Sequence, residues 1–146
     1  LRVLADRREI EDGIICYAHA IDSRNYARLR ECMKPDVRVK FGVADWLTGP
    51  DEAGRYIARA LDPLDMSQHR LSSIEVRLDG DRARSRCYFH APMGRTQPDG
   101  SQHFMTNAGW YEDELVRTAH GWRIAARVCV QPIMIGSLPP DYEIPS

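Results

Sequence analysis

Residues 74–89 read Ile74-Glu75-Val76-Arg77-Leu78-Asp79-Gly80-Asp81-Arg82-Ala83-Arg84-Ser85-Arg86-Cys87-Tyr88-Phe89. On both sides of Asp79-Gly80-Asp81, apolar or small residues alternate with charged or polar ones, which is the pattern of a strand with one buried face. Asp-Gly is also a preferred pair for the tight turn between antiparallel strands. The stretch therefore predicts a β-hairpin whose arginines lie on an outer face, toward solvent or another subunit.

Two more strands are expected downstream. Pro98-Asp99-Gly100 is a turn signal before a long strand from about His103 to Arg117. Ala119-His120-Gly121 then leads into a last strand, from Trp122 to Val130. Together with the hairpin, these strands predict a mostly antiparallel sheet.

The C-terminal end is rich in proline. From Pro132 onward we expect no regular structure, because proline has no backbone N–H to donate to a sheet and Pro139, Pro140 and Pro145 follow. We expect residues 1–131 to form a single domain. Residues 132–146 are expected to be a tail that covers a pocket or contacts another subunit.

Three helices are expected upstream of the hairpin. Between Asp6 and Ile21, apolar residues follow the spacing of one helical face. A second, short helix is expected from about Arg24 to Met33. After a short strand at Val37–Phe41, Gly49-Pro50 opens a third helix, which Pro63 closes. Three helices followed by a strongly curved sheet make an α+β layout, and long hairpin strands folded over a helix form a cone with an interior pocket.

Composition narrows the possible functions. The chain has 146 residues, with 20 Lys and Arg against 21 Asp and Glu, so no overall field attracts nucleic acid or an anionic membrane. Its four cysteines lie far apart, and we expect free thiols in a reducing compartment. No apolar run reaches the roughly 18 residues of a membrane span, and the arginine-rich start is no signal peptide. We therefore expect a cytoplasmic protein that binds neither nucleic acid nor membrane.

Ser67-Gln68-His69, where a linker meets a strand, contains the first candidate for chemistry. Histidine has an ordinary pKa near 6.5, so it is the side chain best suited to accept a proton near neutral pH. Asp22, at the end of the first helix, is the candidate partner, since a carboxylate would keep one ring nitrogen protonated and leave the other free as a base. The alternative for Asp22 is a helix cap, and the alternative for His69 is an ordinary surface residue.

Tyr17 is expected either in the core or in the pocket, where its hydroxyl would donate to a carbonyl or protonate a leaving hydroxyl. Further polar residues lie on strands that can face the same pocket: His90, His103, Asn107, Tyr111 and Arg127. We find no metal-binding spacing, no glycine-rich phosphate loop and no Gly-x-Ser-x-Gly elbow. We therefore expect no metal and no cofactor, and an enzyme that works by positioned acid and base alone.

Several segments resemble scytalone dehydratase and its bacterial relatives, which belong to the SnoaL-like group of the nuclear transport factor 2-like superfamily. These segments are residues 17–26, residues 29–33 with Pro35, Ser67-Gln68-His69 and Gly121-Trp122-Arg123-Ile124. The resemblance spans nearly the whole chain and implies a cystatin-like cone. It also implies an Asp/His dyad of Asp22 and His69, in which the histidine removes a proton from a carbon beside a carbonyl and a hydroxyl then leaves.

The resemblance also bears on the rest of the pocket. It implies a second pocket histidine at His90. Two tyrosines that polarise the substrate carbonyl in the fungal enzyme fall at Ile21 and Phe41, which cannot donate a hydrogen bond. Tyr17 is instead similar to the tyrosine of bacterial bile-acid 7α-dehydratase, a relative with a Tyr, Asp and His set. Other relatives eliminate chloride or formaldehyde, so the leaving group is open.

We therefore expect a cofactor-independent lyase, a dehydratase, for a bulky apolar or aromatic ring compound. His69 is the expected base, Asp22 orients it, Tyr17 is the proton donor, and the substrate is lined by His90, Tyr111, Phe41, Ile21, Asn107 and Arg127. The alternatives are an isomerase, a cyclase or a formaldehyde-releasing lyase on the same site, or a non-catalytic binding or association module. We also expect a homo-oligomer, a dimer or trimer, because the arginine-bearing sheet face and the tail suit a subunit contact and such assemblies are common in this fold.

Overall fold

The computed structural model describes all residues, 1–146. It contains two α-helices, α1 (Arg2–Asp22) and α2 (Pro50–Leu61), and one 3₁₀ helix, η1 (Tyr26–Glu31). The strands are β1 (Met33–Phe41), β2 (Leu47–Thr48), β3 (Met66–Ser67), β4 (Arg70–Asp79), β5 (Arg82–Thr96), β6 (Gln102–Thr118) and β7 (Gly121–Gly136). No helix is long and apolar enough to cross a membrane.

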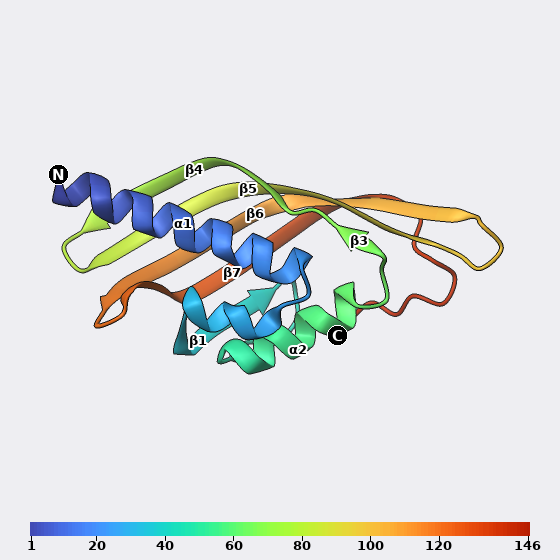
Figure 1. Cartoon of the computed structure of the whole chain (residues 1–146), viewed down its shortest axis with the longest axis horizontal. Helices are drawn as coiled ribbons and strands as arrows, with labels where there is room; N and C mark the ends of the chain where they lie inside the picture. Colours follow the sequence, from blue (N-terminus) through green and yellow to red (C-terminus); the bar gives the residue numbers. More distant parts are fainter.

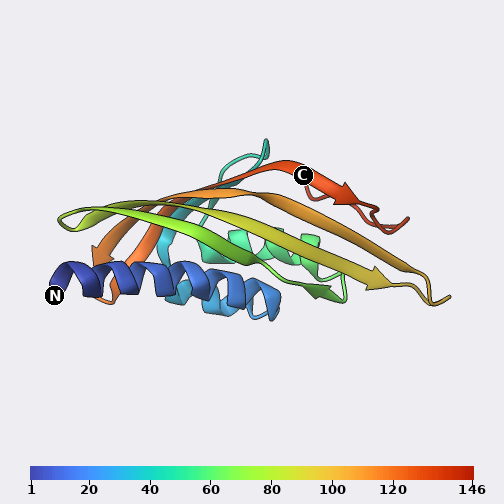
Figure 2. The ribbon, with the colours of Figure 1, turned by 90° about the horizontal axis from the view of Figure 1, so that it is seen from above.

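The elements form two layers, with the helices on one face of a strongly curved sheet (Figures 1 and 2). The strand order is β2-β1-β7-β6-β5-β3, and β4 also pairs with β5. Only β1 and β7 pair in parallel, and the other pairs are antiparallel. The predicted α+β class and mostly antiparallel sheet are confirmed.

The hairpin at residues 74–89 is present as predicted. Asp79 pairs with Arg82, and Gly80 between them has a φ of +60°, which glycine adopts without strain. Along β5, Ala83, Ser85 and Cys87 are buried while the arginines between them are exposed. The alternation in the sequence thus predicts correctly which side chains of β5 are buried and which are exposed.

The second predicted helix is wrong in type and length. It is a 3₁₀ helix of six residues, Tyr26–Glu31, instead of a helix over residues 24–33. Arg24 has a φ of +60°, which interrupts the helical backbone, and Met33 already pairs with Ile124 of β7. The chain therefore turns and enters the sheet earlier than the apolar spacing indicated.

The prediction that the chain is irregular from Pro132 onward is also wrong, because β7 continues to Gly136. Ala108 pairs with Ile133 and Trp110 with Val130, so Gln131 and Pro132 both lie opposite the single residue Gly109. This is a β-bulge, in which the missing N–H of a proline costs no ladder hydrogen bond. The chain beyond Gly136 contains no further helix or strand.

A second bulge changes which side chains of β7 face the helices. Glu114 pairs with Ala126 and Leu115 with Ile124, which leaves Ala125 as the extra residue. Before the bulge Trp122 and Ile124 are buried, and after it Arg127 and Cys129 are buried. Strict alternation, which groups Trp122 with Val128, therefore fails along this strand.

Candidate active site

Asp22 and His69 lie in hydrogen-bonding contact where the end of α1 meets the start of β4. The Asp22 Oδ1 atom is 2.6 Å from His69 Nδ1, and Oδ2 accepts a 2.7 Å hydrogen bond from the His69 backbone N–H. The Ser67 hydroxyl donates to Asp22 Oδ1 at 2.9 Å. The carboxylate thus contacts both the ring and the backbone of the same histidine, which fixes the orientation of the ring.

The electrostatics of Asp22 favour its ionised form. Burial raises the pKa of this carboxyl, but the hydrogen bonds from His69 and Ser67 outweigh that effect and lower its pKa below the ordinary value. An ionised carboxylate only accepts hydrogen bonds, so His69 Nδ1 must carry the proton of the 2.6 Å contact. In the neutral imidazole, Nε2 is then the ring nitrogen without a proton.

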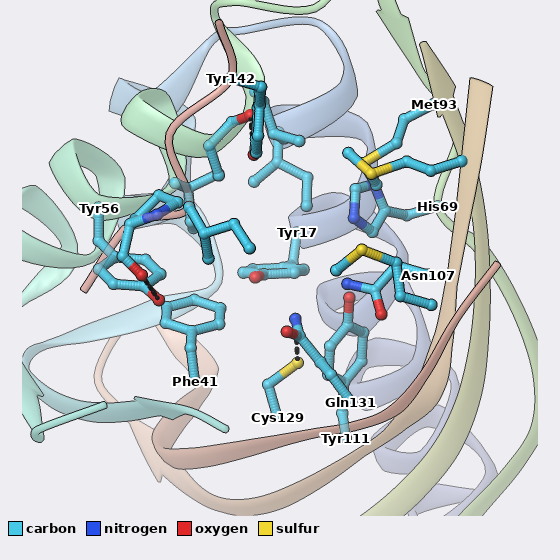
Figure 3. A pocket seen from close by; sticks show the side chains of 18 residues that line it. Tyr17, Phe41, Tyr56, His69, Met93, Asn107, Tyr111, Cys129, Gln131 and Tyr142 are labelled. Atoms are coloured by element: carbon cyan, nitrogen blue, oxygen red, sulfur yellow. Dashed lines mark hydrogen bonds between the residues drawn. The ribbon is translucent and has the colours of Figure 1, made fainter. Parts of the chain in front are cut away.

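His69 lies at the wall of a largely apolar cavity that is partly open to solvent. Figure 3 shows the imidazole facing the same space as Tyr17, Tyr111 and Asn107. Asp22 does not line this cavity, and it lines an outer groove together with Ser67 and His69. The cavity is lined by Tyr17, Ile21, Phe41, Tyr56, Ile57, Ala60, Leu61, His69, Met93, Met105, Asn107, Tyr111, Cys129, Gln131, Met134, Tyr142, Ile144 and Pro145.

Tyr17 and Tyr111 form an aromatic wall of this cavity. Their rings meet edge to face with centroids 5.6 Å apart, and Tyr111 stacks on Phe89 at 4.8 Å. Burial raises the pKa of both phenols, so each hydroxyl keeps its proton and remains a hydrogen-bond donor. Tyr17 comes from α1 and Tyr111 from β6, so their contact joins the helix to the sheet.

Arg127 supports this wall from behind and does not line the cavity. Its guanidinium carbon lies 4.2 Å from the centroid of the Tyr17 ring and 4.1 Å from that of Tyr111. The side chain is fully buried and makes two 2.7 Å hydrogen bonds to Asp113, while its Nη1 atom has no hydrogen-bond partner. Burial alone would lower the pKa of this guanidinium, but the Asp113 carboxylate raises it well above the ordinary value. The prediction that Arg127 lines the substrate pocket is therefore wrong.

The prediction of a second pocket histidine is also wrong, because His90 is exposed on the outer face of β5. It follows the inward-facing Phe89, and successive side chains of a strand point to opposite faces. His103 does not line the cavity either, and its ring lies 3.5 Å from the Ser137 hydroxyl. The other predicted pocket residues, Ile21, Phe41, Asn107 and Tyr111, all line the cavity.

The C-terminal segment closes one side of the cavity with Tyr142, Ile144 and Pro145. The Tyr142 hydroxyl donates to the Ala60 carbonyl of α2 at 2.8 Å, and an Arg95–Asp141 ion pair holds the start of the segment. Figure 1 shows this segment returning from the end of β7 to the end of α2.

Several lining residues were missed by sequence reasoning. Met93 lies near the end of β5, Met105 near the start of β6 and Met134 near the end of β7. Gln131 lies in the bulge opposite Gly109. Alternation on β5 and β6 could have shown Met93 and Met105 as inward-facing. No pattern in the sequence marks Gln131, because its direction depends on the bulge.

This arrangement is suited to proton transfer in an apolar environment. It provides one imidazole nitrogen fixed by a carboxylate, four protonated phenols and two carboxamides within one cavity: His69, Tyr17, Tyr56, Tyr111, Tyr142, Asn107 and Gln131. No group of three or more His, Cys, Asp or Glu side chains is placed to hold a metal ion. Acid-base chemistry on a small apolar molecule is therefore what these side chains can perform.

The amino-acid sequence matches a family of known proteins over most of its length. The profile of the SnoaL-like domain family matches residues 2–128. The uncharacterized protein Rv2910c of Mycobacterium tuberculosis is 31% identical over 135 residues, which cover 90% of each chain.

Solved structures show the same fold. An NTF2-like protein with a cystatin-like fold from Novosphingobium aromaticivorans has a TM-score of 0.73 and 25% identity, covering 90% of this chain and 84% of its own. A scytalone dehydratase-like protein from the same organism has a TM-score of 0.75 and 17% identity, covering 93% and 90%. The hexachlorocyclohexane dehydrochlorinase LinA-type3 from Novosphingobium barchaimii has a TM-score of 0.79 and 16% identity, covering 98% and 97%. The predicted cystatin-like, NTF2-like cone is confirmed.

Proposed function

This chain belongs to the SnoaL-like domain family, and we propose that it is a cofactor-independent lyase, a dehydratase, acting on a bulky apolar or aromatic ring compound. The observation that carries the proposal is the 2.6 Å contact between Asp22 and His69 at the wall of an apolar cavity. A histidine held in one tautomer next to an apolar pocket is an arrangement suited to a general base.

In this proposal His69 Nε2 removes a proton from the carbon beside a substrate carbonyl. Asp22 keeps the ring in the Nδ1–H tautomer and stabilises the imidazolium that forms, as a carboxylate does in a hydrolase triad. The hydroxyl on the neighbouring carbon then leaves with the proton that His69 or Tyr17 supplies. General acid-base help of this kind contributes roughly 10²–10⁴-fold to the rate.

Tyr17 is the proposed donor because its phenol is buried in the cavity wall and stays protonated. Tyr111, Asn107 and Gln131 can also donate a hydrogen bond to a substrate oxygen there. The hydroxyls of Tyr56 and Tyr142, which line the cavity too, already donate to the Pro145 and Ala60 carbonyls. Ile21 and Phe41 supply only apolar contact. This distribution favours a substrate with one polar edge and an otherwise apolar ring system.

Relatives support elimination chemistry without fixing the leaving group. The solved structures with this fold include a scytalone dehydratase-like protein and a dehydrochlorinase. An isomerase would begin with the same proton transfer to His69 and return the proton elsewhere on the substrate. We therefore separate the two by product: loss of one water identifies a dehydratase, and unchanged mass identifies an isomerase.

The experiment is a turnover screen of ring compounds that carry a hydroxyl β to a carbonyl, followed by mass spectrometry. We expect His69→Gln to lower kcat by roughly 10²–10⁴-fold while the protein stays folded. His90→Gln is the matched control, because His90 lies on the outer face of the sheet and we expect wild-type turnover. Wild-type turnover in a folded His69→Gln variant would contradict the proposal.

A further inference from the structure

Arg24 has an unusual backbone conformation directly after α1. Its φ of +60° lies in the left-handed region, which glycine adopts easily and other residues adopt with strain. Only one other non-glycine residue of the chain, Ser73, has a positive φ. Strained backbone of this kind persists where surrounding contacts hold it, and it gathers at functional sites.

The contacts that hold Arg24 all lie around the end of α1. Its Nη1 atom donates to the Ser67 hydroxyl oxygen at 2.7 Å and to the Ile21 carbonyl at 3.1 Å. Its Nη2 atom donates to the Leu64 carbonyl at 3.3 Å, and its Nε atom lies 4.0 Å from Asp62. The guanidinium therefore links α1 to the segment that precedes His69.

The Ser67 hydroxyl connects Arg24 to Asp22. Its oxygen accepts from Arg24, which leaves its single proton for Asp22 Oδ1 at 2.9 Å. The same Oδ1 atom faces His69 Nδ1 at 2.6 Å. Asp22 thus receives three hydrogen bonds, from the Ser67 hydroxyl, the His69 backbone and the His69 ring.

We propose that Arg24 and Ser67 are positioning residues, which fix the rotamer of Asp22 and thereby hold His69 in its Nδ1–H tautomer. This inference rests on the proposed role of His69 as the base. Neither residue lines the cavity, so neither touches a substrate there. Without the Ser67 proton, Asp22 keeps only the two hydrogen bonds from His69 itself, so no group outside that histidine fixes the carboxylate rotamer.

Arg24 has two features that one substitution can separate: its left-handed backbone, which ends α1, and the hydrogen bonds of its guanidinium. Glycine is the usual residue for the left-handed position after a helix. Arg24→Gly therefore suits the backbone and removes only the guanidinium contacts. A purely structural role for Arg24 predicts no effect of this change on His69.

The test reads the tautomer of His69 directly and needs no substrate. Protein labelled with ¹⁵N-histidine is examined by long-range ¹H–¹⁵N NMR at about pH 8.5, above the ordinary histidine range, and His69→Gln assigns the signals. We expect wild type to show only the Nδ1–H tautomer at His69. We expect Ser67→Ala and Arg24→Gly to show a mixture of both tautomers, and Ser67→Thr, which keeps a hydroxyl, to restore the single tautomer.

Ser23→Ala is the matched control, because the Ser23 hydroxyl lies at the same helix end and donates to the Ala20 carbonyl instead of Asp22. We expect its His69 signals to match wild type. A folded Ser67→Ala variant with the wild-type tautomer overturns the inference, whatever Arg24→Gly does. If a substrate is found, we expect Ser67→Ala to lower kcat about tenfold with KM unchanged.

The two proposals fail in different ways. If wild type shows the single tautomer and Ser67→Ala loses it, the positioning role holds even when no compound is turned over. If a substrate is turned over by a His69-dependent reaction while the tautomer is insensitive to Ser67 and Arg24, the proposed function stands and the positioning role is overturned.

Discussion

At the scale of single residues, Arg127 and Asp113 form the most deeply buried ion pair of the chain. Their side chains are 0% and 1% exposed, and the Ser85 hydroxyl donates a further hydrogen bond to Asp113. Removing one partner of such a pair leaves the other as a buried, unpaired charge, and this costs about 3–5 kcal/mol. The guanidinium also lies against the Tyr17 and Tyr111 rings, so the pair supports the cavity wall.

We therefore expect Asp113→Asn to lower the free energy of unfolding by about 3–5 kcal/mol in urea denaturation. The control is Glu112→Gln on the neighbouring position of β6, which removes an exposed contact to Arg86 at 4.0 Å. Exposed pairs contribute about 0–1 kcal/mol, so this variant should denature almost like wild type. Equal effects of the two substitutions would show that Arg127 is not held by its charge partner.

The sequence predicts part of the candidate site at this scale. Asp22 and His69 are predicted as a pair because both residue types suit acid-base work and match a known motif, and the structure brings them into contact. Ser67 and Arg24 are not predicted, since serine before a strand and arginine after a helix are common and only the three-dimensional contacts connect them. His90 was misplaced, although the alternation around Phe89 already assigned it to the outer face.

At the scale of secondary-structure elements, Gly109 allows β6 and β7 to pair on both sides of Pro132. A Cβ atom at Gly109 would lie 1.8 Å from the Val130 carbonyl oxygen, so no other residue fits without moving the strand. Overpacking of this kind costs about 1–3 kcal/mol or more. The bulge that it disturbs is the one that carries Gln131, a residue of the cavity wall.

We expect Gly109→Ala to lower the free energy of unfolding by at least about 1–3 kcal/mol. Gly13→Ala is the matched control: Gly13 is inside α1, and its added Cβ would have as nearest neighbour the Cys32 Cβ at 4.0 Å. Alanine stabilises a helix interior by about 0.5–1 kcal/mol relative to glycine. In urea denaturation, a lower free energy of unfolding for Gly109→Ala and a higher one for Gly13→Ala would support this account. A Gly109→Ala variant as stable as wild type would contradict it.

Helix α1 is attached to the sheet by Asp6, near its first turn. Both carboxylate oxygens accept 2.7 Å hydrogen bonds from Arg117 of β6, and the Trp122 indole N–H donates to Oδ1 at 3.1 Å. These hydrogen bonds lower the pKa of Asp6 from 3.8 to about 2. Because the folded-state pKa is lower than the unfolded one, Asp6 stabilises the fold above pH 3.8, and this contribution is lost as the pH falls toward 2.

We expect Asp6→Asn to be less stable than wild type at neutral pH, with a difference that shrinks between about pH 4 and pH 2. Thermal unfolding at a series of pH values measures this directly. A difference that stays constant over that range would mean that the carboxylate charge does not contribute to docking of α1.

Local sequence patterns predict some helices and strands of this fold but not its bulges. The alternation of residues 74–89 and the apolar spacing of α1 report which face each side chain buries, so these elements were predicted correctly. The bulge at Ala125 inserts one residue into β7, and nothing in the composition of the sequence marks it. After this residue, the side chains that strict alternation assigns to the outer face point inward. At Pro132 the sequence signal was real, since proline cannot donate to a ladder, but the bulge removes the need for that hydrogen bond.

At the scale of the whole molecule, the end of the sheet that carries the last residues of β7 extends beyond the helices (Figure 1), and it carries exposed apolar side chains. Phe104, Ile133 and Ile135 are each half exposed or more, whereas Met134 between the two isoleucines lines the cavity. Beyond Cys129 no strand of this chain pairs with the outer edge of β7, because β1 ends at Phe41. An unpaired edge with exposed apolar side chains is typical of a surface that another chain covers.

We therefore predict that the protein is a dimer or trimer in which this end of β7 is buried. Light scattering at micromolar concentration should give a multiple of the 16.7 kDa chain mass. Ile135→Asp places a charge on a side chain that is 66% exposed, so it should shift the mass to that of one chain without disturbing the fold. Leu4→Asp is the control, because Leu4 is 67% exposed near the start of α1, and α1 begins at the opposite end of the molecule from the end of β7 (Figure 1), so this change should leave the assembly intact. A stable subunit contact buries roughly 1,000 Å² of surface, and a charged side chain buried within it is costly. A wild-type monomer, or an Ile135→Asp variant that remains associated, would therefore contradict this prediction.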